Sequence, residues 1–321
     1  MFEKLGTPAF LREAREGGEG KPFSLWRTLL VFLLVYAITN LLQSFALTPV
    51  LLGMVFSNGE ILSLFSSGAY LENETLIYDT VERMLASNAV LVLTLFATAL
   101  VALTAIVYCR SFEKRSLSSM GLRKRRAFSS SLLGCVLALL LLGGAVVFCF
   151  FFGACTLSPS GTVKIPLLLF LLLGFFVQSF AEEVLFRGYL MASLGRGMKT
   201  SSALLLSAHL FAFFHQANAG VTPLAFLNLF LFGVLASLYM IRTGSLFGTA
   251  VLHAVWNIAQ GLLFGSAVSG QNLPVSLFSL SLNENAVILN GGAFGLEGGL
   301  AVTCVLSLGV ALLGMVKTRE D

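Results

Sequence analysis

Charged residues are scarce in this sequence. Only 11% of its 321 residues are Asp, Glu, Lys or Arg, whereas 57% are hydrophobic. A soluble domain carries about a quarter charged residues, so the deficit excludes an ordinary soluble fold and predicts a polytopic membrane protein. A nucleic-acid-binding signal is missing too, because membrane topology accounts for the positions of the basic residues.

Cysteine motifs are also absent. The five cysteines are odd in number, lie in or beside apolar runs and show no CxxC or CxxH spacing. We therefore expect neither a disulfide framework nor a thiolate metal site, and most of these cysteines are best interpreted as small buried apolar residues. The sequence contains no HExxH zinc motif and no internal repeat of useful strength.

What the chain does contain is a series of apolar runs of about 20 residues, the length that spans a bilayer. They predict an all-α polytopic membrane helix bundle of about eight transmembrane helices, at 28–48, 88–108, 130–152, 165–190, 202–216, 223–241, 245–264 and 298–316. The fifth run is short for a span. We expect three regions: a tail with three spans (1–164), a core with four spans (165–263), and a loop, last span and short tail (264–321).

The basic residues predict the orientation of this bundle. Segment 109–128 holds seven Lys and Arg, and the first 27 residues are also basic, whereas 55–86 and 265–297 carry mainly acidic charge. The positive-inside rule places 109–128 and both termini in the cytoplasm. The first apolar run is too long for the apolar region of a signal peptide, so we expect it to be retained as a span.

Two adjacent carboxylates interrupt the fourth span. Glu182 and Glu183 follow an apolar run that starts at Ile165, and ionisable residues at membrane depth usually serve a function. Residues four apart share a helix face, so Glu183 and Arg187 are expected to pair and Glu182 to stay free. An unpaired carboxylate in a dry environment suits proton transfer. The alternative is that both glutamates merely line a polar seam with Arg187.

All three histidines also fall in expected spans. His253 and Asn257 share one face of the seventh span, His215 lies near the end of the fifth, and His209 lies on a different face. The helical rise of about 1.5 Å per residue gives the depth of each residue from the cytoplasmic end of its span. Glu182, His253, Asn257 and His215 lie about 12–20 Å deep, near the middle of a ~30 Å core. We expect them to meet in one cavity that opens toward the cytoplasmic half.

Three motifs then carry a resemblance that covers about residues 165–263. In order and spacing they are similar to the motifs of the CAAX protease and bacteriocin-processing family (CPBP, also called Abi) of intramembrane proteases. The motifs are Glu182-Glu183-x-x-x-Arg187, Phe211-x-x-x-His215 and His253-x-x-x-Asn257.

The resemblance implies hydrolysis of a peptide bond within the membrane. Carried over to this sequence, Glu182 and His215 would orient and deprotonate a water, while His253 and Asn257 would stabilise the oxyanion. The supporting roles fall to three residues: Glu183 and Arg187, which would hold the helix and the local field, and Phe211, which would pack one turn from His215.

The metal requirement stays open at this point. Glu182, His215 and His253 form a possible catalytic zinc set, and the family has been described both as metalloproteases and as glutamate-dependent enzymes. We expect the reaction to need no cofactor, with Zn²⁺ as the alternative.

Two other classes of function remain. The polar residues could form the path of a proton-coupled transporter, or the chain could be a non-catalytic scaffold or immunity protein. As a protease it would act on a peptide or protein substrate at or in the lipid bilayer, in CAAX-type C-terminal processing or in bacteriocin or surface-protein processing. Its short loops resemble those of bacterial members, which predicts a bacterial cell membrane.

Overall fold

The chain folds as an all-α bundle, as expected. The computed structural model describes residues 5–17, 22–69 and 73–316. Within these residues, six helices are long and apolar enough to cross a membrane: Leu25–Phe56, Asn88–Ser111, Ala127–Phe151, Ile165–Leu194, Pro223–Thr243 and Leu246–Leu263. Two shorter apolar helices are Thr200–Phe214 and Leu300–Met315. These eight segments coincide with the eight expected spans, including the short fifth one.

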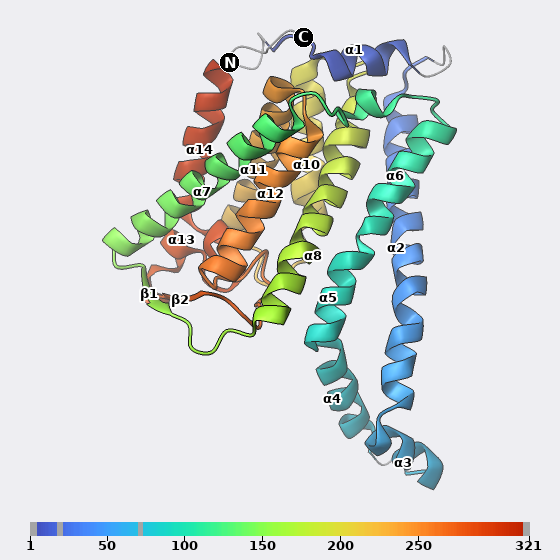
Figure 1. Cartoon of the computed structure of the whole chain (residues 1–321), viewed down its shortest axis with the longest axis vertical. Helices are drawn as coiled ribbons and strands as arrows, with labels where there is room; N and C mark the ends of the chain where they lie inside the picture. The colour runs from blue at the N-terminus through green and yellow to red at the C-terminus, as the bar shows by residue number, and fades with distance from the viewer. Residues whose placement is uncertain (1–4, 18–21, 70–72, 317–321) are drawn as a thin grey trace.

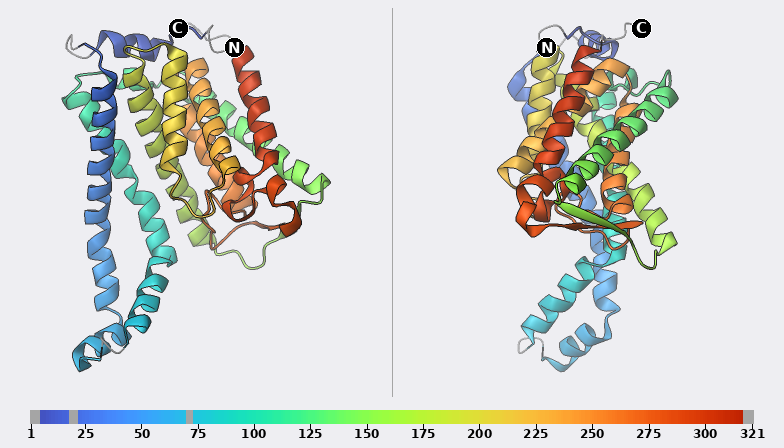
Figure 2. Two further views of the ribbon diagram at one scale, coloured as in Figure 1. Left: turned by 180° about the vertical axis from the view of Figure 1, so that it is seen from behind. Right: turned by 90° about the vertical axis from the view of Figure 1, so that its left-hand side faces the viewer.

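The first described helix and the C-terminal end of the last described helix, α14 (Leu300–Met315), lie at the same end of the bundle (Figure 1). Helix α1 (Ala9–Glu16) lies across that end and packs against the short 3₁₀ helix Leu117–Met120, which belongs to the basic loop 109–128. At the opposite end, the long helix α2 (Leu25–Phe56) leads into α3 (Gly59–Ser67) and α4 (Glu74–Leu85), which project beyond the bundle in both views of Figure 2.

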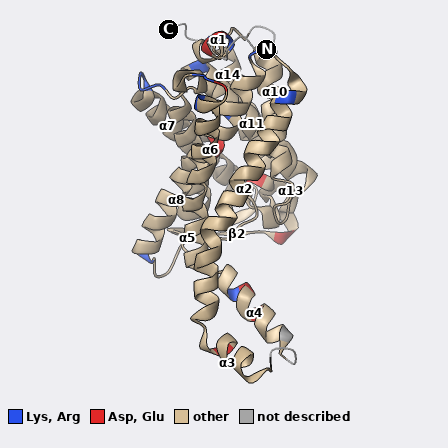
Figure 3. Ribbon diagram, turned by 90° about the vertical axis from the view of Figure 1, so that its right-hand side faces the viewer, with Lys and Arg blue, Asp and Glu red and all other residues tan. Residues whose placement is uncertain are grey.

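The charge distribution follows this arrangement. Most of the Lys and Arg positions, blue on the ribbon of Figure 3, lie at the end of the bundle that carries α1. Segments 55–86 and 265–297 lie at the other end. The two segments expected outside the cytoplasm are therefore on one side of the bundle, and the basic loop is on the other.

Capping residues fix where several helices begin. Ser24 accepts a hydrogen bond from the first turn of α2, and Ser87 does the same for α5 (Asn88–Ala97). Thr222 caps α11 (Pro223–Thr243), whose first residue is a proline that has no N–H to satisfy. Ser245 caps α12 (Leu246–Ile258). Each cap satisfies one of the backbone N–H groups that have no partner within the helix.

The helices around the core approach one another closely. Helix α12 packs along α7 (Ala127–Phe151), and the two backbones meet at Gly134 and Gly248. A Cβ on Gly134 would lie 2.6 Å from the carbonyl oxygen of Gly248, so this crossing requires glycine. Helix α11 packs between α10 (Thr200–Phe214) and α14 (Leu300–Met315).

Two helices change to π-helical geometry just after a motif residue. Helix α8 (Ile165–Glu183) continues as the π-helical segment Val184–Met191 and the short α9 (Ala192–Leu194), and α12 continues as the π-helical segment Ala259–Leu263. Such segments occur often at functional sites. They shift the faces of the following turns relative to a regular α-helix.

A small sheet and several short turns close the end opposite the termini. Strand β1 (Cys155–Pro159) pairs antiparallel with β2 (Phe278–Leu282), with Cys155 opposite Leu282. After β2 come α13 (Val287–Asn290) and the 3₁₀ turns Glu284–Ala286, Gly292–Phe294 and Leu296–Gly298. The remaining span consists of α5 and α6 (Ala99–Ser111), which are separated by a break at Thr98.

Candidate active site

The two glutamates of α8 have separate surroundings. Glu183 is fully buried, and its Oε1 pairs with Arg187 Nη1 at 3.0 Å, so the ion pair expected from the spacing is present. Glu182 is partly exposed, and its Oε1 accepts a hydrogen bond from Gln178 Nε2 at 2.5 Å. Its Oε2 is buried and has no hydrogen-bond partner among the described residues. The expectation that Glu182 is free is therefore right for one of its two oxygens only.

Arg187 is buried on all sides. Besides Glu183, it contacts the carbonyl oxygen of Gly233 at 3.4 Å from Nη2. Its guanidinium lies over the ring of Phe211, 4.4 Å from the ring centre. The attraction between a cation and the face of an aromatic ring strengthens where water is excluded. Phe211 thus packs against this ion pair as well as against His215, whose ring centre is 4.5 Å from its own.

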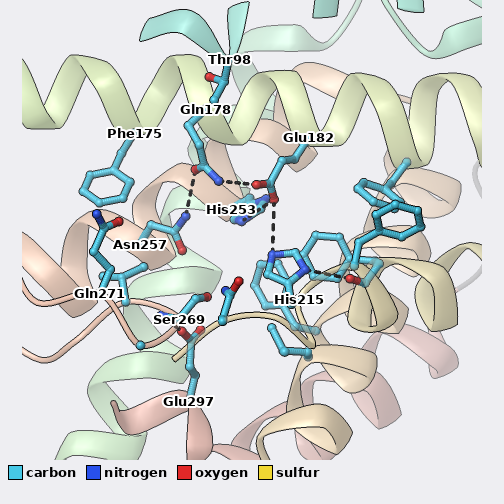
Figure 4. A pocket seen from close by; sticks show the side chains of 18 of the residues that line it. Thr98, Phe175, Gln178, Glu182, His215, His253, Asn257, Ser269, Gln271 and Glu297 are labelled. Carbon is cyan, nitrogen blue, oxygen red and sulfur yellow. Dashed lines mark hydrogen bonds and ion pairs between the residues drawn. The ribbon is translucent and has the colours of Figure 1, made fainter. Parts of the chain in front are cut away.

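Both motif histidines present Nε2 to Glu182. His215, the residue that follows α10, has Nε2 3.9 Å from Glu182 Oε2. His253, in the middle of α12, has Nε2 at the same distance of 3.9 Å from that oxygen. Figure 4 shows the two rings pointing toward the carboxylate from different helices. The structure therefore brings together the expected residues of α8, α10 and α12.

Hydrogen bonds at the other ring nitrogen orient each histidine. His215 Nδ1 lies 2.7 Å from the carbonyl oxygen of Phe211, which can only accept, so Nδ1 carries the proton and donates. His253 Nδ1 lies 2.8 Å from Glu183 Oε1, where a carboxylate likewise accepts. In neutral His215, the lone pair of Nε2 therefore faces Glu182.

Asn257 lies one turn beyond His253 and lines the same cavity. Its Nδ2 is 3.3 Å from Gln178 Oε1 and 3.4 Å from Ser179 Oγ, both long for a hydrogen bond. Gln178 therefore contacts Glu182 on one side and Asn257 on the other (Figure 4). His209 points elsewhere and packs against the ring of Phe226, 5.8 Å between centres, in line with its expected separate face.

These side chains line a cavity of about 620 Å³, within the usual range of ligand sites. Aromatic residues form much of its wall, and α2 and α5 contribute polar side chains from outside the core region 165–263. The lining also includes Asn218, residues 268–271 and Glu297, which belong to connections at the end opposite the termini. These connections therefore form part of the cavity wall.

A zinc ion held by Glu182, His215 and His253 fits this arrangement poorly. The chemistry of the donors is suitable, because each histidine is oriented through Nδ1. A tetrahedral zinc with bonds of about 2.0–2.1 Å would require its ligand atoms to lie about 3.3 Å apart. Both Nε2 atoms instead lie 3.9 Å from Glu182 Oε2. Within the described part of the chain, no group of three or more His, Cys, Asp or Glu is placed to hold a metal.

A comparison with protein-family models gives one match to this site. Residues 164–259 match the family model described as type II CAAX prenyl endopeptidase, Rce1-like. The matched segment belongs to that family. It begins at the start of α8 and ends just after Asn257, so it contains every motif residue named above. Neither a comparison with curated proteins nor one with solved structures gave a match.

The family supports a CAAX-type intramembrane protease in general, and with the apolar helices it indicates an integral membrane protein. The matched segment corresponds closely to the expected core 165–263. Three features of the site were not expected from the sequence: the contact between Glu183 and His253, the position of Gln178, and the presence of Glu297 in the cavity. Of these three, only the role of Gln178 could have been inferred from the sequence, because this polar residue lies one helical turn before Glu182 in a largely apolar helix.

Proposed function

We propose that this protein is an intramembrane endopeptidase in which Glu182 and His215 activate a water and His253 and Asn257 stabilise the oxyanion. One observation carries the proposal. Glu182 Oε2 is buried, lacks a hydrogen-bond partner among the described residues, and faces Nε2 of both histidines at 3.9 Å. An unpaired carboxylate oxygen between two imidazoles is costly at membrane depth unless it serves the reaction.

The separation suits a bridging water. A direct hydrogen bond ends at about 3.2 Å, so 3.9 Å leaves Glu182 Oε2 and His215 Nε2 unbonded, yet one water can contact both. That water donates one proton to Oε2 and a hydrogen bond to the lone pair of Nε2. Its oxygen attacks the carbonyl carbon of the peptide. Glu182 then passes the proton to the leaving nitrogen as the carbon–nitrogen bond breaks.

The oxyanion requires donors on the other side of the carbonyl. A protonated His253 donates from Nδ1 to Glu183 and keeps an Nε2–H for the cavity. His253 and Arg187 are then the two cations, and Glu182 and Glu183 are the two carboxylates. A low-dielectric environment tolerates this neutral set better than an excess of either charge. Asn257 supplies a second donor, because its contacts to Gln178 and Ser179 are long and easily exchanged.

The supporting residues act on orientation. Glu183 is held by Arg187 and in turn holds the ring of His253, so its carboxylate links the ion pair to the reacting groups. Phe211 fixes His215 twice, through its carbonyl oxygen and through its ring. This division requires no metal, in keeping with the wide spacing of the three possible zinc ligands.

The family match supports a proposal for the substrate class. We place this chain among enzymes that cleave a peptide or protein at the membrane, in CAAX-type C-terminal processing or in bacteriocin or surface-protein processing, within a bacterial cell membrane. The aromatic walls of the cavity suit an apolar segment of substrate.

A cleavage assay on the purified protein tests the proposal. The protein in detergent or liposomes is incubated with a library of apolar peptides, and products are identified by mass spectrometry. We expect cleavage by the unmodified protein and none by Glu182→Ala. Proton flux without cleavage would favour a transporter. A folded protein with neither activity would favour a scaffold or immunity role.

A further inference from the structure

The catalytic cavity contains a second carboxylate, outside the segment that matches the family. Glu297 lies in the 3₁₀ turn Leu296–Gly298, just before α14, and only 7% of its surface is exposed. It lines the same cavity as Glu182 and His215. Figure 4 draws Glu182 and Glu297 at opposite sides of the cluster, with Ser269 next to Glu297.

The backbone around Glu297 is held from two sides. Asn228, buried in α11, donates from Nδ2 to the carbonyl oxygens of Glu297 and Gly299 at 2.8 and 2.9 Å. The N–H of Leu296 donates to Ser266 Oγ at 3.1 Å. Gly295 has a φ of +93°, and a Cβ there would lie 2.0 Å from the carbonyl oxygen of Ala267. The fold therefore places this carboxylate at a fixed position.

Among the described residues, no cation contacts the carboxylate of Glu297 directly. Its Oε1 accepts a hydrogen bond from the backbone N–H of Ser269. No Lys, Arg or His nitrogen lies within 4 Å of it in the part of the chain that the structure describes. Burial raises the pKa of the Glu297 carboxyl, and its interactions with Ser269, His215 and Gln260 offset this only in part. A buried carboxylate in this position is stabilised when a cation reaches it.

The rest of the cavity adds to the negative potential. The described residues that line it include two carboxylates, Glu182 and Glu297, and no lysine or arginine. With His253 charged as the oxyanion donor of the proposed mechanism, the two carboxylates still leave the lining with a net negative charge. A cavity with low-dielectric walls and a net charge concentrates ligands of the opposite sign. The aromatic side chains around it, among them Phe175 and Phe232, suit the aliphatic stem of a long basic side chain.

On the basis of the proposed protease function, we propose that Glu297 forms a subsite for a basic side chain, lysine or arginine, of the peptide substrate. Glu297 and Glu182 lie apart across the cavity, so the basic residue occupies a position removed from the scissile bond. Glu297 comes from a connection at the end of the bundle opposite α1. The basic residue of the bound substrate therefore lies between the scissile bond and that end. The substrate is thus an apolar segment with one basic residue at a fixed distance from the cut.

A positional series of peptides tests this. Apolar peptides that differ at one position, occupied by Lys, norleucine or Glu, are compared by their kcat/KM. We expect one position at which Lys exceeds norleucine by about tenfold or more, with Glu the poorest. In Glu297→Gln this ratio should fall close to one, because the amide keeps the bond from Ser269 but loses the charge. Glu297→Asp should retain part of the preference.

Glu284→Gln is the matched control, because Glu284 is an exposed carboxylate of the same connection and should leave the ratio unchanged. Absence of a lysine preference in the unmodified protein would overturn the proposal, and so would its survival in Glu297→Gln. The lysine preference of the unmodified protein is measured without any variant. The proposal can therefore be rejected even if Glu297→Gln folds poorly.

Binding separates this proposal from the protease function. The Lys and norleucine peptides, fluorescently labelled, are titrated into Glu182→Gln protein with and without Glu297→Gln. Tighter binding of the Lys peptide that depends on Glu297 supports the subsite even if the unmodified protein cleaves nothing. Equal binding of the two peptides rejects it even if cleavage occurs.

Discussion

His253 Nδ1 lies 2.8 Å from Glu183 Oε1, the same oxygen that pairs with Arg187 Nη1 at 3.0 Å. One buried carboxylate oxygen therefore serves both a structural ion pair and a histidine of the site. The neighbouring Glu182 faces the opposite nitrogen of that histidine. Two adjacent residues of α8 thus face the two nitrogens of one imidazole, and only Glu183 is hydrogen-bonded to it.

The first prediction separates those tasks. Glu183→Gln leaves Arg187 without its partner in a fully buried position, where breaking such a pair costs about 3–5 kcal/mol. We expect a much lower folded yield and a lower melting temperature. Glu182→Gln keeps the shape and its partly exposed position, so it should abolish cleavage and leave melting nearly unchanged. Thermal unfolding in detergent measures both, and equal destabilisation by the two variants would contradict the assignment.

A second prediction concerns Gln178, which bridges Glu182 and Asn257. Gln178→Leu retains the approximate volume but removes a hydrogen bond to a carboxylate, an interaction worth about 1.5–3 kcal/mol. We expect kcat/KM to fall by about 10–100-fold, mainly in kcat, because Glu182 is no longer held toward the water. Gln43→Leu is the control, since Gln43 lines the same cavity but donates to the carbonyl of Ala97. Loss of the same size in the control would refute a specific role.

The sequence predicted the fold better than it predicted the site. Eight apolar runs were enough for the helices, because burial in lipid depends on composition and length alone. Helical spacing was likewise enough for the pair of Glu183 and Arg187, a contact within one helix. Which helices are neighbours depends on packing such as the approach of Gly134 to Gly248, and that is not encoded in any single motif.

The same limit explains the missed residues. The contact of Glu183 with His253 joins positions 70 residues apart, so no local pattern reveals it. Glu297 lies among glycines in a connection, where a carboxylate normally faces water, and only tertiary packing turns it into the cavity. The expected opening toward the cytoplasmic half stays a prediction, because the depth of a residue does not indicate which connections cover it.

A third prediction tests the orientation in the membrane. In a background without the five native cysteines, Ser116→Cys and Ser66→Cys place thiols at exposed positions on opposite ends of the bundle. An impermeant maleimide added to intact cells should label Ser66→Cys and leave Ser116→Cys unlabelled until the cells are permeabilised, because the loop 109–128 is strongly basic. The reverse pattern would invert the topology and place Glu297 on the cytoplasmic side.

The last prediction addresses the metal, because the same side chains behave differently around zinc. If Asn257 is an oxyanion donor, Asn257→Ala should lower kcat by about 10²–10³ with little change in KM, since the lost interaction belongs to the transition state. Purified protein should then cleave peptide without bound metal and resist chelators.

If zinc is held by Glu182, His215 and His253 instead, the three groups must move closer than the 3.9 Å separations seen here. In that case Asn257→Ala should be milder, His215→Ala and His253→Ala should lose metal, and a chelator should stop turnover until Zn²⁺ is restored. Metal content measured on the same preparation as activity decides between the two. Stoichiometric zinc that rises and falls with turnover would reject the metal-free mechanism, whereas full activity in metal-free protein would leave Glu182 and His215 as the pair that activates the water.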